Sequence, residues 1–362
     1  MKIAIFTECY PPSVGGQEIR FAEMAQVMIR RGHSVDVFCV RNMRDSSSAE
    51  SVDGVAVHRY PEAFNYQQPL IKALKRRPWV VMQYAYWCRK QAREHFDLCL
   101  YNQWPLAHIF LAPSEVRSKA IADWCEVREG WVFGAIQRAL PKMTAMNMAV
   151  SQAVKRKMES LSGQSFTYVP SGIFVDRYRS VPREQRWGIL YIGRLTEHKN
   201  LGLLIEAFEQ LRASGYEGPL RIAGGGPALV GLQKQIAQSP QRENIQLLGF
   251  ASEEQKVELL SSAQVLVIPS RREGFPRIVA EAMASGLPTV TVDYPENGTR
   301  DVVREYGVGM VSNPDAKSLS QSIRDTLTDW EKYSQAGLSA CRSLDWDVVV
   351  DELLRLPQQR QN

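Results

Sequence analysis

Two glutamates flank a turn in the segment EGFPRIVAE, residues 273–281. The apolar run at 265–268 predicts a buried strand before this turn, and residues 278–283 predict the start of a helix after it. Pro276 fits the first helical position, because the N–H group that proline lacks would have no helical partner there. Backbone amides at a helix start are donors at the positive end of the helix dipole. The turn therefore predicts a binding site for an anion or for hydroxyl groups.

The two glutamates differ in their distance from the mouth of this site. Glu273 follows the strand, at the edge of a sheet where open α/β folds bind ligands. Glu281 lies about two turns further along the helix. A pair of acids around a donor-rich turn suits a ligand that carries both hydroxyl groups and phosphate. The alternatives are that Glu273 only complements the helix dipole and that Glu281 is a solvated helix residue.

A second charged loop, GRLTEHKN at residues 193–200, also joins a predicted strand to a predicted helix. Arg194 and Lys199 stand near the amino end of that helix, where the helix dipole disfavours cations. Two cations at such a place indicate a bound anion, since arginine forks onto phosphate oxygens and lysine adds a point charge. The alternative is that both side chains are exposed and solvated.

Loops that contain glycine follow three further strands. Residues 224–227 (GGGP) predict a loop where a ribose or base approaches the backbone at Gly225, and Leu248 ends the next strand as a wall for the base. Gly15 and Gly16 link the first strand to the first helix and leave room for a donor group at the helix start. This last loop is not G-x-G-x-x-G, so a dinucleotide cofactor is not predicted.

The elements that position these loops alternate between strand and helix along the whole chain, which predicts an α/β fold with parallel sheets. Strands are expected at residues 2–7, 34–40, 55–59, 98–101, 119–122 and 146–151, and again at 187–192, 220–223, 245–248, 265–268 and 287–292. We expect an N-terminal domain over residues 1–168, a C-terminal domain over 169–345, and a final helical segment over 346–362 that packs on the N-terminal domain.

Composition limits the classes of protein to which the chain could belong. Its 362 residues are enough for two domains, and 44% hydrophobic and 23% charged residues are typical of soluble globular proteins. No apolar run reaches the roughly 20 residues that span a bilayer, and the first residues enter a strand instead of a signal peptide. The six cysteines form no C-x-x-C pair and the five histidines are scattered, so we expect reduced core cysteines, no metal site and a cytoplasmic protein.

Charge is uneven between the two halves of the chain. Residues 1–170 hold 22 Lys and Arg against 15 Asp and Glu, which leaves 22 against 24 for the remainder. The N-terminal half is therefore expected to face an acidic partner, such as anionic lipid headgroups at the inner membrane face or a phosphorylated acceptor. A slightly basic solvated surface is the alternative.

Residues 60–95 interleave aromatic and basic side chains. This mixture is typical of contact with a lipid interface or a specific acceptor, and equally of amphipathic helices packed on a sheet. The aromatic residues are Phe64, Tyr66, Trp79, Tyr84, Tyr86 and Trp87, and the basic ones are Lys72, Lys75, Arg76, Arg77, Arg89 and Lys90.

Together these loops resemble a known family. The combination of G-R-L-x(3)-K-N, A-G-G-G-P and P-S-x-x-E-G-F-P-x(4)-E-A-M-A-x-G-x-P is similar to that of the retaining GT-B glycosyltransferases of glycosyltransferase family 4. P-P-x-x-G-G after the first strand and VPSGIFVD at residues 169–176 match as well, and the resemblance is weakest between residues 41 and 145. It implies two Rossmann-like domains facing across a cleft that closes on the donor. It also implies transfer of a sugar from a nucleoside diphosphate to an acceptor hydroxyl with retention of the anomeric configuration.

The resemblance implies a role for each residue that matches the nucleotide-binding part of the family pattern. Arg194 and Lys199 would hold the donor diphosphate and stabilise it as it leaves, supplying the charge that a metal would otherwise give. Glu281 would bind the ribose hydroxyls. Gly16 would lie against the diphosphate.

The transferred sugar would be held by Glu273 together with the turn residues Gly274, Phe275 and Pro276. Glu273 would be a positioning group, because the departing phosphate is thought to accept the acceptor's proton in this family. The family needs no metal or other cofactor. The implied partners are a donor of the UDP or GDP type and an acceptor that is a sugar, a lipid-linked molecule or a small molecule, and no nucleic acid is expected.

One position departs from the family pattern. Many members carry a histidine after a strand of the N-terminal domain, beside the sugar, and the matching place here is ADWCE at residues 122–126. Asp123 would then contact a sugar hydroxyl or the acceptor in place of that histidine. The alternative is an N-cap or turn aspartate.

Two other functions stay open. One is a different GT-B enzyme acting on nucleotide sugars, such as an epimerase, which would need added acid and base groups, or a glycogen-type phosphorylase, which would need a pyridoxal lysine. The other is a non-catalytic nucleotide-sugar binding protein, which would be expected to lack Glu273, Arg194 or Lys199; all three are present.

Overall fold

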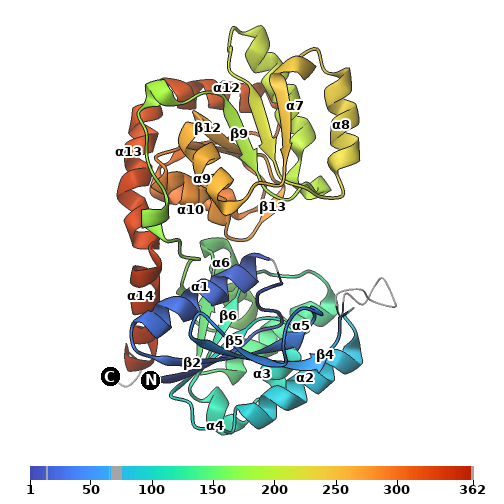
Figure 1. Ribbon diagram of the computed structural model, residues 1–362, viewed down its shortest axis with the longest axis vertical. Helices are drawn as coiled ribbons and strands as arrows, with labels where there is room; N and C mark the ends of the chain where they lie inside the picture. Colours follow the sequence, from blue (N-terminus) through green and yellow to red (C-terminus); the bar gives the residue numbers. More distant parts are fainter. Residues whose placement is uncertain (14, 65, 67–75, 360–362) are drawn as a thin grey trace. The chain divides into compact units, whose positions relative to one another are not determined.

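The computed structural model describes residues 1–13, 15–64, 66 and 76–359 (Figure 1). The chain divides into two compact units: an N-terminal unit of Met1–Ser171 together with Trp346–Asn362, and a C-terminal unit of Gly172–Asp345. Lys72 and Lys75, which belong to the aromatic and basic set of the sequence, lie outside the described residues. Within the described part of the chain, no helix is long and apolar enough to span a bilayer.

The N-terminal unit is built on one sheet with the strand order β3-β4-β2-β1-β5-β6-β7-β8. Neighbouring strands are parallel except β3 and β4, which are antiparallel. The strands are β1 (Lys2–Phe6), β2 (Ser34–Arg41), β3 (Ala49–Val52), β4 (Val55–Glu62), β5 (Leu98–Asn102), β6 (Ala120–Trp124), β7 (Met146–Ala149) and β8 (Thr167–Tyr168). The helices are α1 (Gly16–Arg30), α2 (Pro78–Gln91), α3 (Ala107–Leu111), α4 (Ser114–Arg117), α5 (Trp131–Ala139), α6 (Gln152–Ser162) and α14 (Trp346–Gln359).

The C-terminal unit is a six-stranded parallel sheet with the order β11-β10-β9-β12-β14-β16. Its strands are β9 (Ile189–Ile192), β10 (Leu220–Ala223), β11 (Ile245–Gly249), β12 (Val265–Ile268), β14 (Thr289–Val292) and β16 (Gly309–Ser312), and β13 (Arg272–Glu273) pairs separately with β15 (Glu296–Asn297). Its helices are α7 (Leu201–Ala213), α8 (Leu229–Gln238), α9 (Glu253–Ser262), α10 (Arg277–Ala284), α11 (Gly298–Tyr306), α12 (Ala316–Thr328) and α13 (Trp330–Ala340). Short apolar strands such as β12, buried along its whole length, form the core.

The predicted fold class is confirmed, since each unit is a helix-covered sheet whose strands are all parallel except β3 (Figure 1). Strand β3 was not predicted, because its sequence AESV is half polar and partly exposed. Strand β16 and the two-residue strands β8, β13 and β15 were not predicted either. Asn200 is the N-cap residue of α7, but its side chain makes no capping hydrogen bond and its backbone is left-handed, with φ of 56°.

The last helix, α14, belongs to the N-terminal unit and packs along α1. Trp346 at its start is buried, and its Nε1 donates a hydrogen bond of 2.7 Å to Glu23 Oε2 on α1. Arg31, at the end of α1, donates to the backbone oxygen of Asp347 over 2.6 Å. Packing and polar contacts therefore hold α14 on α1.

Candidate functional site

The turn after β12 brings Glu273 onto Lys199. Glu273 Oε1 accepts a hydrogen bond of 2.7 Å from Ser270 Oγ and forms an ion pair with Lys199 Nζ. The two charged residues are 74 positions apart in the sequence, and both are half-buried. Lys199 reaches this place because β9 and β12 are neighbours in the sheet, so the loops at their carboxyl ends meet.

The backbone of the turn is fixed by the loop after β14. β13 in this turn pairs with β15, and a side chain at Gly298 would place its Cβ 2.0 Å from the carbonyl oxygen of Gly274. Only a residue without a Cβ allows this approach. Pro276 is the N-cap of α10, one place earlier than the first helical position predicted for it. Gly274 and Phe275 are half-buried at the same turn.

Glu281 is a buried member of an ion-pair cluster. Its side chain is 3% exposed, so the alternative of a solvated helix residue is wrong. Oε1 accepts hydrogen bonds from Lys256 Nζ over 2.9 Å and from Arg277 Nε over 3.2 Å. The Tyr178 phenol lies beside the carboxylate, and burial, followed by the charge of Glu281, raises the pKa of Tyr178. The sequence analysis identified neither Lys256 nor Arg277; only Arg277, four residues before Glu281, had a local signal.

Cations surround the mouth of the turn. Arg194 is exposed, and in the described part of the chain its guanidinium has no hydrogen-bond or ion-pair partner. The pKa of His198 is lowered by partial burial and then by the charge of Lys199, with Arg272 and Arg194 adding to the effect and Glu273 opposing it. Three cations and one carboxylate therefore lie close enough to His198 to affect the pKa of its imidazole. The sequence analysis did not identify Arg272 as part of this set.

The GGGP loop after β10 packs on the loop that carries Arg194. Gly224 and Gly226 have φ of 139° and 155°, and a Cβ there would lie 1.9 Å from Gly193 O and 2.3 Å from Leu195 O, respectively. Gly225 differs, because a Cβ there would have no neighbour within 4 Å. Leu248 is exposed at the end of β11. Two of the three glycines are therefore explained by backbone packing, and Gly225 alone borders open space.

This difference predicts opposite effects of alanine at neighbouring positions. Gly226→Ala forces a left-handed backbone and a steric clash, so we expect the free energy of unfolding to fall by about 2 kcal/mol or more. Gly225→Ala should change it by less than about 0.5 kcal/mol but raise the donor KM if a ribose or base approaches there. Urea unfolding and donor titrations measure both quantities. Equal stability of the two variants would contradict the packing role of Gly226.

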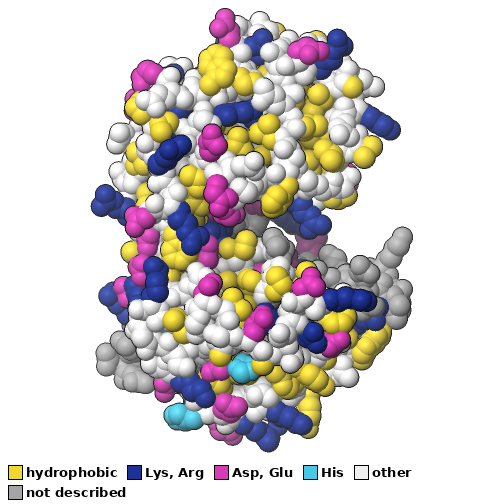
Figure 2. Space-filling view, viewed as in Figure 1, with side chains coloured by type: hydrophobic (Ala, Val, Ile, Leu, Met, Phe, Trp, Pro, Cys, Tyr) yellow, Lys and Arg dark blue, Asp and Glu magenta, His cyan; other side chains and the backbone are white. Residues whose placement is uncertain are grey.

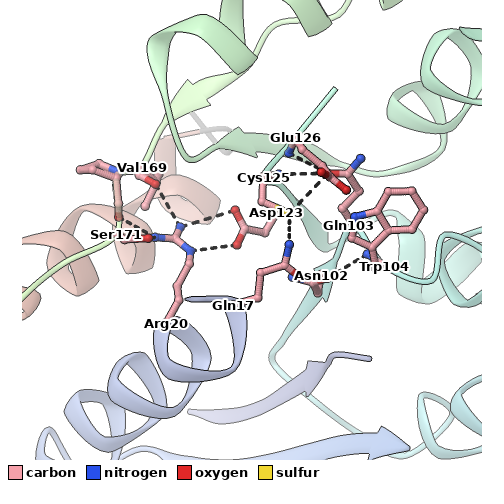
Figure 3. Close-up of polar contacts among 11 residues, drawn as sticks. Gln17, Arg20, Asn102, Gln103, Trp104, Asp123, Cys125, Glu126, Val169 and Ser171 are labelled. Carbon is pink, nitrogen blue, oxygen red and sulfur yellow. Dashed lines mark hydrogen bonds and ion pairs between the residues drawn. The ribbon is translucent and has the colours of Figure 1, made fainter. Parts of the chain in front are cut away.

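In the N-terminal unit, Asp123 is wholly buried beneath Arg20 (Figure 3). Arg20 Nε donates to Asp123 Oδ2 over 3.0 Å and Nη2 donates to Oδ1 over 3.4 Å. The aspartate lies within β6, so it is neither an N-cap nor a turn residue. Because both carboxylate oxygens are bonded to Arg20, this arrangement argues for a structural role of Asp123 and against contact with a sugar or acceptor.

Arg20 also binds the chain where it leaves the N-terminal unit. Its Nη1 donates to Pro170 O over 2.6 Å, and its Nη2 donates to Val169 O over 3.0 Å (Figure 3). The guanidinium carbon lies 6.0 Å from the ring centre of Trp346, where the chain returns. One buried arginine thus contacts both segments that join this unit to the rest of the chain. The sequence analysis did not identify it.

The amino end of α1 is open at Gly16. A Cβ at Gly16 would have no neighbour within 4 Å, whereas a Cβ at Gly15 would lie 2.2 Å from Glu18 Oε2. Burial raises the pKa of Glu18, and the nearby charge of Glu8 adds to the effect. The space that the sequence predicts at Gly16 is therefore present, with Glu18 as its acidic neighbour.

Other polar features of the chain lie apart from these loops. A cavity of about 860 Å³ lies at the amino ends of β6 and β7, among Arg117, Lys119 and Lys142, at the sheet edge opposite Asp123. Among the described residues, no group of three or more His, Cys, Asp or Glu side chains is arranged to hold a metal ion. The six cysteines, all of them described by the structure, form no disulfide bond, and five of them are buried.

The chain is similar to known proteins in both sequence and fold. Residues 175–340 match the family Glycosyl transferases group 1. An uncharacterized glycosyltransferase of Methanocaldococcus jannaschii is 25% identical over 98% of this chain and 97% of its own. The phosphatidyl-myo-inositol mannosyltransferase of Mycobacterium tuberculosis is 30% identical over 62% of each chain. HepE of Anabaena, solved in complex with UDP and glucose, has a TM-score of 0.75 at 16% identity and covers 99% of this chain and 100% of its own.

Proposed function

We propose that this chain, a glycosyltransferase with a glycosyl transferases group 1 domain, moves a sugar from a nucleoside diphosphate to an acceptor hydroxyl and retains the anomeric configuration. The matched domain lies in the C-terminal unit, which carries Arg194, Lys199, Glu273 and Glu281. The family and the GT-B fold predicted from the sequence are confirmed. The nature of the donor, the roles of single residues and the acceptor are proposals.

The observation that carries the proposal is the ion pair between Lys199 and Glu273, beside the exposed guanidinium of Arg194. A diphosphate needs cations, and a sugar with several hydroxyl groups needs a fixed acceptor. Lys199 and Arg194 supply the charge for the diphosphate, which spreads onto the departing oxygens as the glycosidic bond breaks. Glu273, held by Ser270 on one side and Lys199 on the other, fixes a sugar hydroxyl.

Glu281 binds the ribose hydroxyls in this proposal. Its carboxylate accepts hydrogen bonds from Lys256 and Arg277, which fix its position. Gly225 and Leu248 border the nucleoside, and Gly274, Phe275 and Pro276 border the sugar. The departing phosphate accepts the proton of the acceptor hydroxyl, so no protein nucleophile and no metal are needed.

Two features support a membrane-associated acceptor. The N-terminal half of the chain carries the excess of Lys and Arg, and the mannosyltransferase relative is named for a phosphatidylinositol lipid. We therefore propose that the N-terminal unit makes peripheral contact with an acidic membrane surface and takes a lipid-linked acceptor.

The donor proposal is tested by mixing the purified chain with UDP-glucose, other UDP sugars and GDP sugars. We expect slow release of free nucleotide from one donor without added acceptor, and binding of the same nucleotide by calorimetry. UDP comes first in the panel, because the structural neighbour HepE binds it. Absence of release, transfer and binding with every donor in the panel would refute the proposal.

A further inference from the structure

Helix α2 of the N-terminal unit has two apolar faces. Val80, Tyr84 and Cys88 are buried and pack into the core of the unit. On the opposite face Trp79, Met82 and Tyr86 are 49%, 52% and 57% exposed. Their spacing of three and four residues aligns them along one stripe of the helix. A helix packed on a sheet normally turns polar side chains to solvent, so this stripe needs a partner.

Cations accompany the exposed rings, and acids are lacking. The guanidinium of Arg77 lies 5.6 Å from the centre of the Trp79 ring, and the ammonium of Lys90 lies 5.0 Å from that of Tyr86. The sequence of α2, PWVVMQYAYWCRKQ, contains no Asp or Glu. On the adjoining strand β4, Glu62 is paired with Arg41. The stripe is therefore apolar along its length and has a basic residue at each end.

A neighbouring helix also exposes an aromatic side chain. Helix α3 packs against α2 and exposes Phe110. Figure 2 shows hydrophobic side chains next to Lys and Arg over the part of the N-terminal unit where Figure 1 draws α2. The aromatic and basic set in the sequence thus divides by helical position: Tyr84 packs on the sheet, while Trp79 and Tyr86 face outward.

We infer that this α2 face, formed by Arg77, Trp79, Met82, Tyr86 and Lys90, lies on the surface of an anionic bilayer. Tryptophan and tyrosine rings prefer the headgroup region, and lysine and arginine extend their charges from apolar stems to lipid phosphates. The inference rests on the peripheral contact proposed for the N-terminal unit and names the surface that makes it.

Charge favours a bilayer over a second copy of this chain. A symmetric contact between two such faces would bring Arg77 and Lys90 of one copy against the same cations of the other. Lipid phosphates instead offer charge of the opposite sign, and each basic residue near such a surface strengthens binding. The face therefore suits a flat, acidic and partly apolar partner.

The test is co-sedimentation of the full chain with vesicles of phosphatidylcholine plus phosphatidylglycerol, and with vesicles of phosphatidylcholine alone. We expect binding to the mixed vesicles that weakens with salt. The double variant Trp79→Ala/Tyr86→Ala and the variant Lys90→Glu should each bind on the order of tenfold more weakly. The matched control is Trp187→Ala, which removes an equally exposed tryptophan (52%) from the C-terminal unit and should bind like the native chain.

Four outcomes would overturn the inference. The native chain could fail to sediment with the mixed vesicles, or the double variant could sediment as well as the native chain. The native chain could elute as a dimer that the double variant lacks, which would assign the face to a second copy. The double variant could unfold at a much lower temperature, which would show that Trp79 and Tyr86 stabilise the fold of the chain itself. Donor-dependent nucleotide release, unchanged in the double variant, separates this result from failure of the proposed chemistry.

Discussion

Replacing Lys199 with alanine is expected to lower kcat/KM for the nucleotide-sugar donor by a factor on the order of 100 to 1,000. Loss of one preorganised charge that stabilises a departing oxyanion typically has this effect. Two contacts orient Glu273, one with Lys199 and one with Ser270. The substitution removes the contact with Lys199, so the carboxylate that holds the sugar loses its orientation. Steady-state kinetics with the donor identified by the panel measure the change.

The control for Lys199 is Lys234→Ala, which removes an exposed lysine from α8 in the same unit and should leave kcat/KM unchanged. Glu273→Gln should reduce kcat/KM by a comparable factor. The double variant should lose much less than the product of the two, because the paired side chains act as a unit. Purely multiplicative effects would show that Lys199 and Glu273 contribute to catalysis independently and not as a pair.

The sequence predicted the fold and the loops of the C-terminal unit because both depend on local order. Short apolar runs such as 265–268 could only be buried strands, and their alternation with helices required parallel sheets. In a parallel sheet every loop after a strand lies at one edge. Arg194, Lys199 and Glu273 each follow a predicted strand. The sequence therefore also predicted that these residues lie near one another.

Contacts between elements that are distant in the sequence could not be predicted from local sequence order. Lys256 reaches Glu281 from another helix, and Arg20 reaches Asp123 across 103 residues. Asp123 appeared as a candidate for the acceptor site because its position matches a family histidine. The structure adds what the sequence could not contain, namely the arginine that covers it.

Helix α2 was ambiguous for a different reason. Apolar residues fill both the buried face with Val80 and Tyr84 and the exposed face with Trp79 and Tyr86, so no single apolar stripe stands out. Only the burial of each side chain in the structure distinguishes the two faces. Packing on the sheet is confirmed for the buried face of α2, while contact of the exposed face with a lipid interface or an acceptor stays a prediction.

The largest expected effect on stability is that of Arg20→Met. The substitution removes the partner of a buried carboxylate and three hydrogen bonds to the segment that leaves the N-terminal unit. Breaking a buried pair on one side typically costs about 3–5 kcal/mol, because an uncompensated charge stays in the interior. Urea unfolding followed by tryptophan fluorescence should show a lower midpoint for the N-terminal unit, whose Trp124 and Trp346 lie buried.

Two variants decide whether the cost comes from the buried charge. Arg30→Met, on the same helix, affects an arginine that is half exposed and 3.5 Å from Asp347, so it should cost less than about 1 kcal/mol. The double variant Arg20→Met/Asp123→Leu removes both charges. It should recover much of the lost free energy of unfolding, because two apolar side chains of similar size leave no buried charge without a partner. If the double variant is no more stable than Arg20→Met, the hydrogen bonds to residues 169–171, and not the ion pair, are what Arg20 contributes. If Arg20→Met costs no more than Arg30→Met, the buried network does not stabilise the unit.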